Sequence, residues 1–300
     1  MPDSLTDSSQ AAGPARSVPK AQVLPIGSSD IPDVADFLHA TMGSKTSAAD
    51  WRHSMSAPWD VEQPNHGFHM RADGRVVGAY LALYSERVID GQVRRICNLA
   101  AWSVAEPHRA TGLRLLRALL RQKGFTFTDL TPNPNVVTLN SRLGFAALDT
   151  TTALVVNVPL PLWSRGVRVL DRPAQIESVL SGADSEIYRD HMRTAARHAV
   201  ITDGVDHCYV IYRREWYKHL PLFATVLFVG NSDVFRRLSP HFYRYLFLRK
   251  GIPATLVETR VVGHRPRRSK IVPGRTRMYL SEDLDPEQID YLYSELTCLT

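Results

Sequence analysis

The first half of the chain carries short apolar runs and helical apolar patterns in alternation. Apolar runs bounded by turn residues predict strands at 22–26, 68–71, 76–85, 95–104, 125–130 and 148–158. Apolar spacings of three and four predict helices at 33–40, 48–55, 112–122 and 135–143. A hairpin followed by strand, helix, strand, helix and strand predicts an α/β domain whose mixed, mostly antiparallel central sheet is flanked by helices.

The second half shows a similar order of elements. Helices are expected at 175–180, 186–198 and 234–248, and strands at 207–213, 223–229 and 254–262. A helix-ending Gly precedes an apolar strand in both halves, at 119–125 and at 247–252. We interpret this as a duplicated fold. Because such junctions are common in α/β proteins, chance convergence is the alternative.

Composition divides the chain into three parts. Residues 1–20 are rich in Ser, Ala, Pro and Asp and are expected to form a disordered tail. Pro159 and Pro161 mark a linker. We therefore expect a first domain at 21–160 and a second domain at 161–300.

The overall composition excludes several classes of protein. The longest apolar run, Leu220 to Val229, is far shorter than the roughly 20 residues that cross a bilayer. The Ser- and Asp-rich start lacks the design of a signal peptide, so a soluble, cytoplasmic protein is expected. The chain has 3 cysteines, far apart, and no Cys or His cluster, which fits a reducing compartment and indicates no metal site.

The formal net charge of +6 lies mostly in the second half. Its cations concentrate in a segment without acidic residues, namely Arg260, Arg265, Arg267, Arg268, Lys270, Arg275 and Arg277. A solvated basic loop is the commoner structure for such a segment. The alternative is an anionic partner, such as a phosphorylated substrate or an anionic glycan, with nucleic acid the least favoured.

The segment 98–145 has features that suit phosphate binding. A strand ends at Val104, a turn follows at Pro107, and the sequence from Arg109 to Gly112 opens a helix. A helix start leaves backbone N–H groups unpaired and carries the positive end of the helix dipole, so it can hold a diphosphate. One Gly at a helix start is often only a turn requirement, so this motif alone is weak evidence.

The order of the pieces resembles the GNAT acyltransferase superfamily. The residues that carry the resemblance are Val104, Pro107, Arg109, Gly112, Asn133, Gly144 and Phe145. The resemblance implies a tandem GNAT-like fold that uses acetyl-CoA or another acyl-CoA as co-substrate and needs no metal. The corresponding stretch of the second half, 230–236, lacks Arg-x-x-Gly and carries Asp233, which implies a degenerate second copy.

The resemblance also implies which residues hold the co-substrate. The strand end would pair with the pantetheine arm, and the loop after it would hold the diphosphate. The implied binding residues are Trp102, Ser103, Val104, Arg109, Ala110, Thr111, Gly112, Leu113, Arg114, Asn133 and Asn140. Arg114 replaces a small residue of the family, and its side chain either points outward or adds a cation at the phosphates. Asn140 replaces a Tyr that often protonates the leaving thiolate, and Asn cannot supply that proton.

A base is needed to take a proton from the acceptor. Asp129 is the first candidate because its position relative to Asn133 places it near the strand opening, although a turn-capping Asp is the commoner structure. Glu86 and Asn98 complete the predicted catalytic set. Further candidates, as base or in the cleft wall, are His66, His108 and Cys97.

We therefore predict an acyltransferase that moves an acyl group from acyl-CoA to an amine or hydroxyl of a small-molecule or glycan-type acceptor. Transfer would be direct, in a ternary complex. One alternative is an acyl-CoA-binding regulatory or partner-binding module without turnover. Another is an aminoacyl-tRNA-dependent transferase, which would give the basic segment a use. Acyl length, acceptor identity and oligomeric state are open at the level of the sequence.

Overall fold

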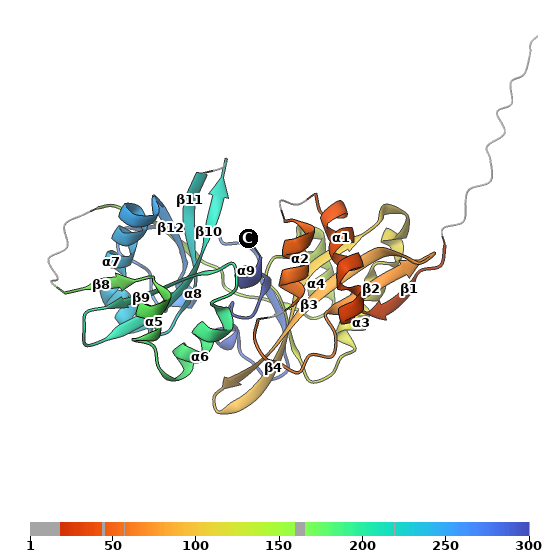
Figure 1. Ribbon diagram of the computed structural model, residues 1–300, viewed down its shortest axis with the longest axis horizontal. Helices are drawn as coiled ribbons and strands as arrows, with labels where there is room; N and C mark the ends of the chain where they lie inside the picture. Colours follow the sequence, from red (N-terminus) through yellow and green to blue (C-terminus); the bar gives the residue numbers. More distant parts are fainter. Residues whose placement is uncertain (1–18, 44–45, 57, 160–165, 219, 300) are drawn as a thin grey trace, which may run out of the picture.

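The computed structural model describes residues 19–43, 46–56, 58–159, 166–218 and 220–299 (Figure 1). The strands of the first half are β1 (Gln22–Pro25), β2 (Gly67–Ala72), β3 (Arg75–Ile89), β4 (Gln92–Val104), β5 (Thr126–Asp129), β6 (Ala146–Ala147) and β7 (Thr152–Val156). Its helices are α1 (Ile31–Thr41), α2 (Ala48–Met55), α3 (Leu113–Leu120) and α4 (Pro134–Arg142), with 3₁₀ turns η1 (Ser28–Asp30) and η2 (Glu106–Thr111).

The second half has the same kinds of elements. Its strands are β8 (Arg168–Leu170), β9 (Arg197–Thr202), β10 (His207–Tyr217), β11 (Leu220–Val229), β12 (Ala254–Glu258), β13 (Ser269–Val272) and β14 (Met278–Leu280). Its helices are α5 (Pro173–Glu177), α6 (Gly182–His191), α7 (Ser232–Lys250), α8 (Thr259–Val262) and α9 (Glu295–Cys298), with a 3₁₀ turn η3 (Pro286–Gln288).

Two mixed seven-stranded sheets lie side by side, one on each side of the molecule in Figure 1. The first has the order β1-β2-β3-β4-β5-β14-β6, and the second has the order β8-β9-β10-β11-β12-β7-β13. In each sheet the fourth and fifth strands are parallel and the other neighbours are antiparallel. The predicted pair of α/β domains with mixed sheets is confirmed.

The two sheets exchange one strand each. β7 follows the first half along the chain but pairs with β12 and β13 of the second sheet. In return, β14 pairs with β5 and β6 of the first sheet. The predicted strand 148–158 is therefore wrong in its place as the last strand of the first sheet, and the sheets do not divide at the expected boundary near residue 160. Both exchanged strands occupy the same position in their sheets.

Local sequence accounts for the elements that frame the first sheet. Asp73 and Gly74 have φ of 49° and 76°, and Asp90 and Gly91 have 50° and 75°. Left-handed backbone at both turn residues matches the right-handed twist of a two-residue hairpin, so both predicted hairpins form. α3 buries three leucines against the sheet, which gives the helix an apolar face.

Some predicted bounds in the second half are wrong. The helix expected at 186–198 ends at His191, and Arg197 already begins β9. The strand expected at 254–262 ends at Glu258 and gives way to the single helical turn α8. Of the expected disordered tail 1–20, residues 1–18 lie outside the described residues. No helix among the described residues is long and apolar enough to cross a membrane.

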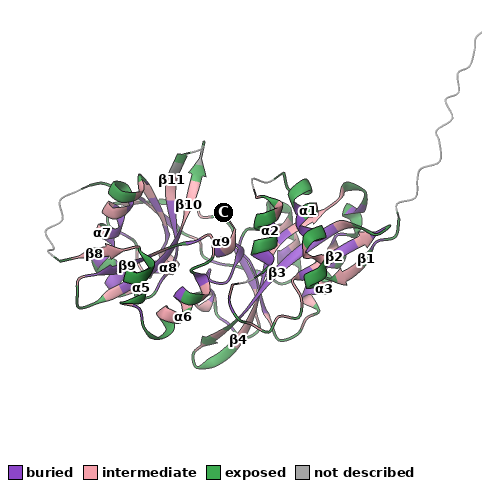
Figure 2. Cartoon of the chain, viewed as in Figure 1, coloured by how far each residue is buried: buried purple, intermediate pink, exposed green. Residues whose placement is uncertain are grey.

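One apolar core joins the two halves. It contains Tyr209, Ile211 and Leu227 from one face of the second sheet together with Trp59 and Leu83 from the first half. The chain after β14 fills the space between them, with α9 lying between the halves (Figure 1) and its surroundings buried (Figure 2). The opposite face of the second sheet packs against α7 in a separate core.

Candidate functional site

The central strands of the first sheet separate partway along their length. β4 and β5 pair in parallel only from Ile96 with Thr126 to Asn98 with Thr128. Beyond Asn98, β4 continues to Val104 while β5 ends at Asp129. One edge of the end of β4 therefore faces an opening in the sheet instead of a neighbouring strand.

A β-bulge reorients the side chains at this opening. The pairing of β3 with β4 shifts register between Tyr80, opposite Trp102, and Ala82, opposite Leu99. Such a bulge reverses the alternation of the strand, so Trp102 faces the same side as Leu99. Trp102 stacks on the buried Tyr80 ring at a centroid distance of 4.7 Å.

A pocket of about 280 Å³ lies between the end of β4 and the starts of α3 and α4. We call it the β4–α4 groove. Its lining residues are Trp102, Val104, Arg109, Gly112, Asn133, Asn135, Val136 and Leu139. Five of these, spread over some 30 residues of sequence, belong to the predicted co-substrate set. The fold thus brings together four of the seven residues that carry the family resemblance, namely Val104, Arg109, Gly112 and Asn133.

The loop before α3 is more regular than the sequence suggested. Residues Glu106–Thr111 form the 3₁₀ turn η2, and the N–H of Gly112 donates to the Arg109 carbonyl at 3.1 Å. That N–H is therefore not free for a phosphate, contrary to the expectation of unpaired groups along this loop. In the first turn of α3 the Leu115 N–H is also paired, since it donates to the Gly112 carbonyl at 3.0 Å. Arg109 is exposed at the groove.

Three predicted binding residues have other contacts. The Arg114 guanidinium donates to the Ala21 carbonyl at 2.8 Å, on the β1 side of α3, so it is not among the groove residues. The Ser103 hydroxyl donates to Thr41 of α1 at 2.9 Å, so only the Ser103 backbone lies at the strand opening. Ala110 and Thr111 are exposed on η2, and Leu113 begins α3.

Asp129 lies at the end of β5, where the strands separate, and is 4% exposed. Asn140 of α4 donates to its carboxylate at 2.9 Å. Burial raises the pKa of Asp129 to about 6, although hydrogen bonds from Asn140, the Thr131 backbone and Tyr80 lower it. Asn140 is itself fully buried and does not line the groove. It therefore orients the Asp129 carboxylate and is not one of the residues that could contact the co-substrate in the groove.

A second carboxyl, Glu295 of α9, lies beside this position. It is 4% exposed, accepts a hydrogen bond from Thr131 at 2.9 Å, and its backbone N–H donates to the Asn98 side chain at 3.1 Å. Burial, together with the negative charge of Asp129, raises the pKa of Glu295 to about 7. One of its oxygens has no hydrogen-bond partner among the described residues. Sequence reasoning missed Glu295, because no local pattern connects it with the first sheet.

The remaining catalytic candidates lie elsewhere. The buried Asn98 side chain donates to the Thr128 hydroxyl and accepts from the Glu295 backbone N–H. It therefore links β5 to α9 and does not line the groove. Glu86 lies towards the tip of the β3–β4 hairpin and pairs with Arg95 at 3.5 Å. The other three candidates, none of which lines the groove, are His66, His108 and Cys97.

In the second half, residues 230–236 correspond to the loop from Arg109 to Arg114, and side chains fill the space beside them. Asn231 caps α7 with its own side chain, which accepts from the N–H groups of Asp233 and Val234. The Asp184 carboxyl fills the space beside Gly230, where an added Cβ would lie 2.4 Å from it. A carboxylate at this position would repel a phosphate.

Three cations of the basic segment have structural partners. Arg277 is buried and pairs with Glu258 at 2.8 Å, and Arg275 pairs with Glu215 at 2.8 Å. Arg260 donates to the Pro286 and Ile289 carbonyls. Only the part from Arg265 to Lys270 is therefore available to an anionic partner. No group of three or more His, Cys, Asp or Glu in the described part of the chain could hold a metal ion.

No protein-family model matches the sequence, and neither does any curated protein. Solved structures do match. A GCN5-related N-acetyltransferase from Anabaena variabilis has a TM-score of 0.56 and 11% identity, covering 87% of this chain and 72% of its own. One from Kribbella flavida has a TM-score of 0.57 and 14% identity, covering 87% and 71%. The chain therefore has the GNAT fold, built as two such α/β domains in tandem.

Proposed function

We propose that the β4–α4 groove binds an acyl-coenzyme A and that the protein transfers its acyl group to an amine or hydroxyl of a small-molecule or glycan-type acceptor. The observation that carries this proposal is the position of the groove, at the separation of β4 and β5 in a GNAT fold. Bound acyl-coenzyme A would present an activated thioester, with the coenzyme A thiolate as a good leaving group.

The residues present suit such a molecule. At Ser103 and Val104 one edge of β4 pairs with β3, and the other edge lies beyond the end of its pairing with β5. The backbone on this second edge can pair with an extended polar arm. Arg109 offers an exposed cation beside the helix start, where a diphosphate would be stabilised. A Cβ on Gly112 would lie 3.0 Å from Val104 Cγ2 and 3.2 Å from the Arg109 carbonyl, so a larger side chain at this position would crowd the groove.

Asp129 is the proposed base. A carboxyl with a pKa of about 6 is ionised at neutral pH and still a useful proton acceptor. Tyr80 connects it to the groove, since its hydroxyl bonds to Asp129 and its ring stacks on Trp102. Asn140 fixes the orientation of the carboxylate. Transfer would be direct, with the acceptor attacking the bound thioester in a ternary complex.

A coenzyme-A-binding module without turnover is the second candidate. The observation that favours it is the burial of both carboxyls, since Asp129 and Glu295 are each 4% exposed. A base must reach the proton that it removes. Turnover therefore separates the two candidates, whereas coenzyme A binding is common to both.

Gly112→Asp tests the groove. We expect calorimetry on the full-length variant to show at least a tenfold loss of coenzyme A affinity, because a carboxylate there crowds Val104 and repels the diphosphate. Ala49→Asp, at an exposed position in the first turn of α2, is the matched control and should bind normally. Undiminished affinity in Gly112→Asp would remove the groove assignment. Thiol release from acetyl-CoA with a panel of amines and sugars then tests turnover.

A further inference from the structure

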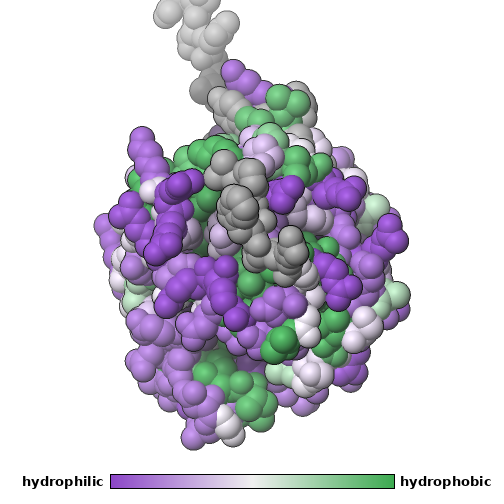
Figure 3. Space-filling view, turned by 90° about the vertical axis from the view of Figure 1, so that its left-hand side faces the viewer, coloured by the Kyte–Doolittle hydropathy of each residue, from purple (hydrophilic) through white to green (hydrophobic). Residues whose placement is uncertain are grey.

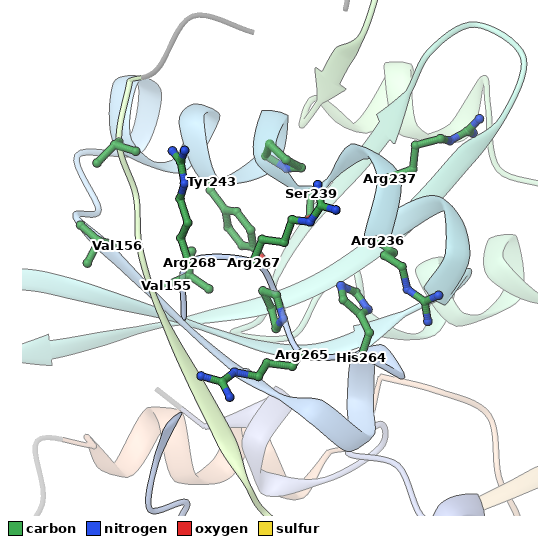
Figure 4. Close-up of a pocket in the computed structure, with 13 residues that line it drawn as sticks. Val155, Val156, Arg236, Arg237, Ser239, Tyr243, His264, Arg265, Arg267 and Arg268 are labelled. Carbon is green, nitrogen blue, oxygen red and sulfur yellow. The ribbon is translucent and has the colours of Figure 1, made fainter. Parts of the chain in front are cut away.

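A pocket of about 800 Å³ belongs to the second half (Figure 4). We call it the α7 pocket. It lies between α7, the end of β7 and the segment 264–268 that follows α8. Its volume is in the range of sites that bind small molecules. Its residues are Val155, Val156, Val158, Arg236, Arg237, Ser239, Pro240, Tyr243, His264, Arg265, Pro266, Arg267 and Arg268.

The pocket is open because a covering helix is short. In the first half, the nine-residue α4 follows β5 and lies over the sheet beside α3. In the second half, the element in the same place is α8, a single turn of four residues. The chain then runs on from Gly263, and residues 264–268 line the pocket together with α7 and the end of β7.

The wall of the pocket is strongly basic. It contains five arginines and no acidic residue. Arg267 and Arg268 are exposed and make no ion pair with any described residue, and Figure 4 shows both reaching from the loop towards α7. Arg265 donates only to the Ser269 carbonyl. Arg236 and Arg237 are different, since Arg236 pairs with Asp233 at 3.8 Å and Arg237 points away and pairs with Asp206. Uncompensated guanidinium groups around a hollow favour a phosphate-type anion.

The floor of the pocket is apolar except for one hydroxyl, that of Tyr243, which lacks a hydrogen-bond partner among the described residues. Val155 and Tyr243 belong to the core between the sheet and α7. The Tyr243 side chain is 8% exposed, and its hydroxyl has no hydrogen-bond partner of good geometry among the described residues. Burial raises the pKa of Tyr243, and the nearby Ser239 side chain, also in the wall, lowers it by a smaller amount. A buried unpaired hydroxyl costs stability unless a ligand or water satisfies it.

The α7 pocket does not face the first half. Val155 and Val210 point into the α7 side of the second sheet, whereas Tyr209 and Leu227 point into the core shared with the first half. The pocket thus lies on the α7 side of the second sheet; the end of the molecule formed by this half, seen in Figure 3, has a mostly hydrophilic surface with smaller apolar areas. A ligand there is separated from the β4–α4 groove by the second sheet, so it is not the acyl acceptor.

We infer that the α7 pocket is a second ligand site, for a small organic phosphate whose apolar part contacts Val155 and Tyr243 and whose phosphate pairs with Arg267 and Arg268. The concave, partly apolar shape favours a small molecule over a nucleic acid strand, which needs an extended basic groove with exposed aromatic rings. This inference is independent of the proposed acyl transfer.

Calorimetry of the full-length protein with 1-naphthyl phosphate and with inorganic phosphate tests the site. We expect naphthyl phosphate to bind at least tenfold more tightly than phosphate, because its rings reach the apolar floor. The double variant Arg267→Gln/Arg268→Gln should lose at least tenfold in affinity for naphthyl phosphate. Tyr243→Phe keeps the ring and should bind a few-fold more weakly, since only the hydroxyl contact is lost.

The matched control is Arg172→Gln/Arg249→Gln, which removes two exposed arginines of the second half outside the pocket. It should bind naphthyl phosphate normally. An equal loss in the control would show general charge attraction and overturn the site, as would equal affinity for the two phosphates. A 12-nucleotide DNA strand that binds more tightly than naphthyl phosphate and displaces it would overturn the small-molecule assignment in favour of nucleic acid.

Discussion

Two buried carboxyls, Asp129 and Glu295, share the point at which the first sheet opens. Each has its pKa raised by burial, and the charge of Asp129 raises the pKa of Glu295 further. Because two nearby carboxylates repel each other in a poorly solvated place, the pair tends to hold one proton near neutral pH. Such a pair can take up the proton that the amine or hydroxyl of the acyl acceptor loses, and can keep this proton within the protein.

Asp129→Asn is expected to lower turnover by a factor on the order of 10² or more while coenzyme A affinity stays nearly constant, because Asn cannot take up a proton. Steady-state thiol release and calorimetry measure the two effects separately. Asp60→Asn, at an exposed carboxylate, serves as control. If the pH–rate profile of the Asp129 variant matches that of the native protein, Asp129 has only a structural role.

Glu295→Gln is expected to change how stability depends on pH. The folded pKa of about 7 exceeds the ordinary value, so the unfolded chain ionises first as the pH rises. The native protein therefore loses stability from about pH 4.5 up to about pH 7, by on the order of 1–3 kcal/mol from this group. The variant should lack this loss. Thermal unfolding at pH 5 and pH 8 measures it, and Glu86→Gln should retain the native pH dependence.

The sequence predicted part of this site. Trp102, Arg109, Gly112 and Asn133 were found because they lie within one continuous motif. Glu295 was not, since it is far along the chain from β5 and reaches it only through tertiary structure. The role of Arg114 was also beyond the sequence, because its partner, Ala21, lies just before β1 and far from α3 along the chain.

At the scale of elements, the reciprocal exchange of β7 and β14 ties each sheet to the other half. Most strands and helices were predictable, because their apolar spacing and turn residues are local properties. The partner of a strand is not local. β7 has the same apolar run whether it completes the first sheet or the second, so the sequence could not distinguish these arrangements.

A fragment of residues 21–160, the predicted first domain, is expected not to fold cooperatively. It lacks β14, which lies between β5 and β6, and it leaves β7 without the strands that it pairs with. Circular dichroism during heating should show no sharp transition. Adding back a peptide of residues 274–299 should restore ordered structure, and a sharp transition in the fragment alone would contradict this role of β14.

At the scale of the whole molecule, the halves should unfold together. The shared core buries apolar residues of both halves, and an ion pair links Arg87 of β3 to Asp290 at 2.7 Å. Each sheet contains one strand from the other half of the chain, β14 in the first sheet and β7 in the second. Unfolding of either half therefore removes a strand from the sheet of the other half. The two GNAT-type copies are thus expected to behave as one cooperative unit.

Leu227→Ala tests this cooperativity. Leu227 is fully buried in the shared core on the second sheet, so its truncation should cost about 2–5 kcal/mol. If the halves unfold as one, calorimetry should show a single transition shifted down by several °C. The slowest-exchanging amides of β2 and β3 should then exchange faster by the same free energy as those of β10 and β11. Leu38→Ala, in the separate core under α1, should act on both sheets in the same way. Unchanged exchange in β2 and β3 of the Leu227 variant would instead show that the first half unfolds independently of the second.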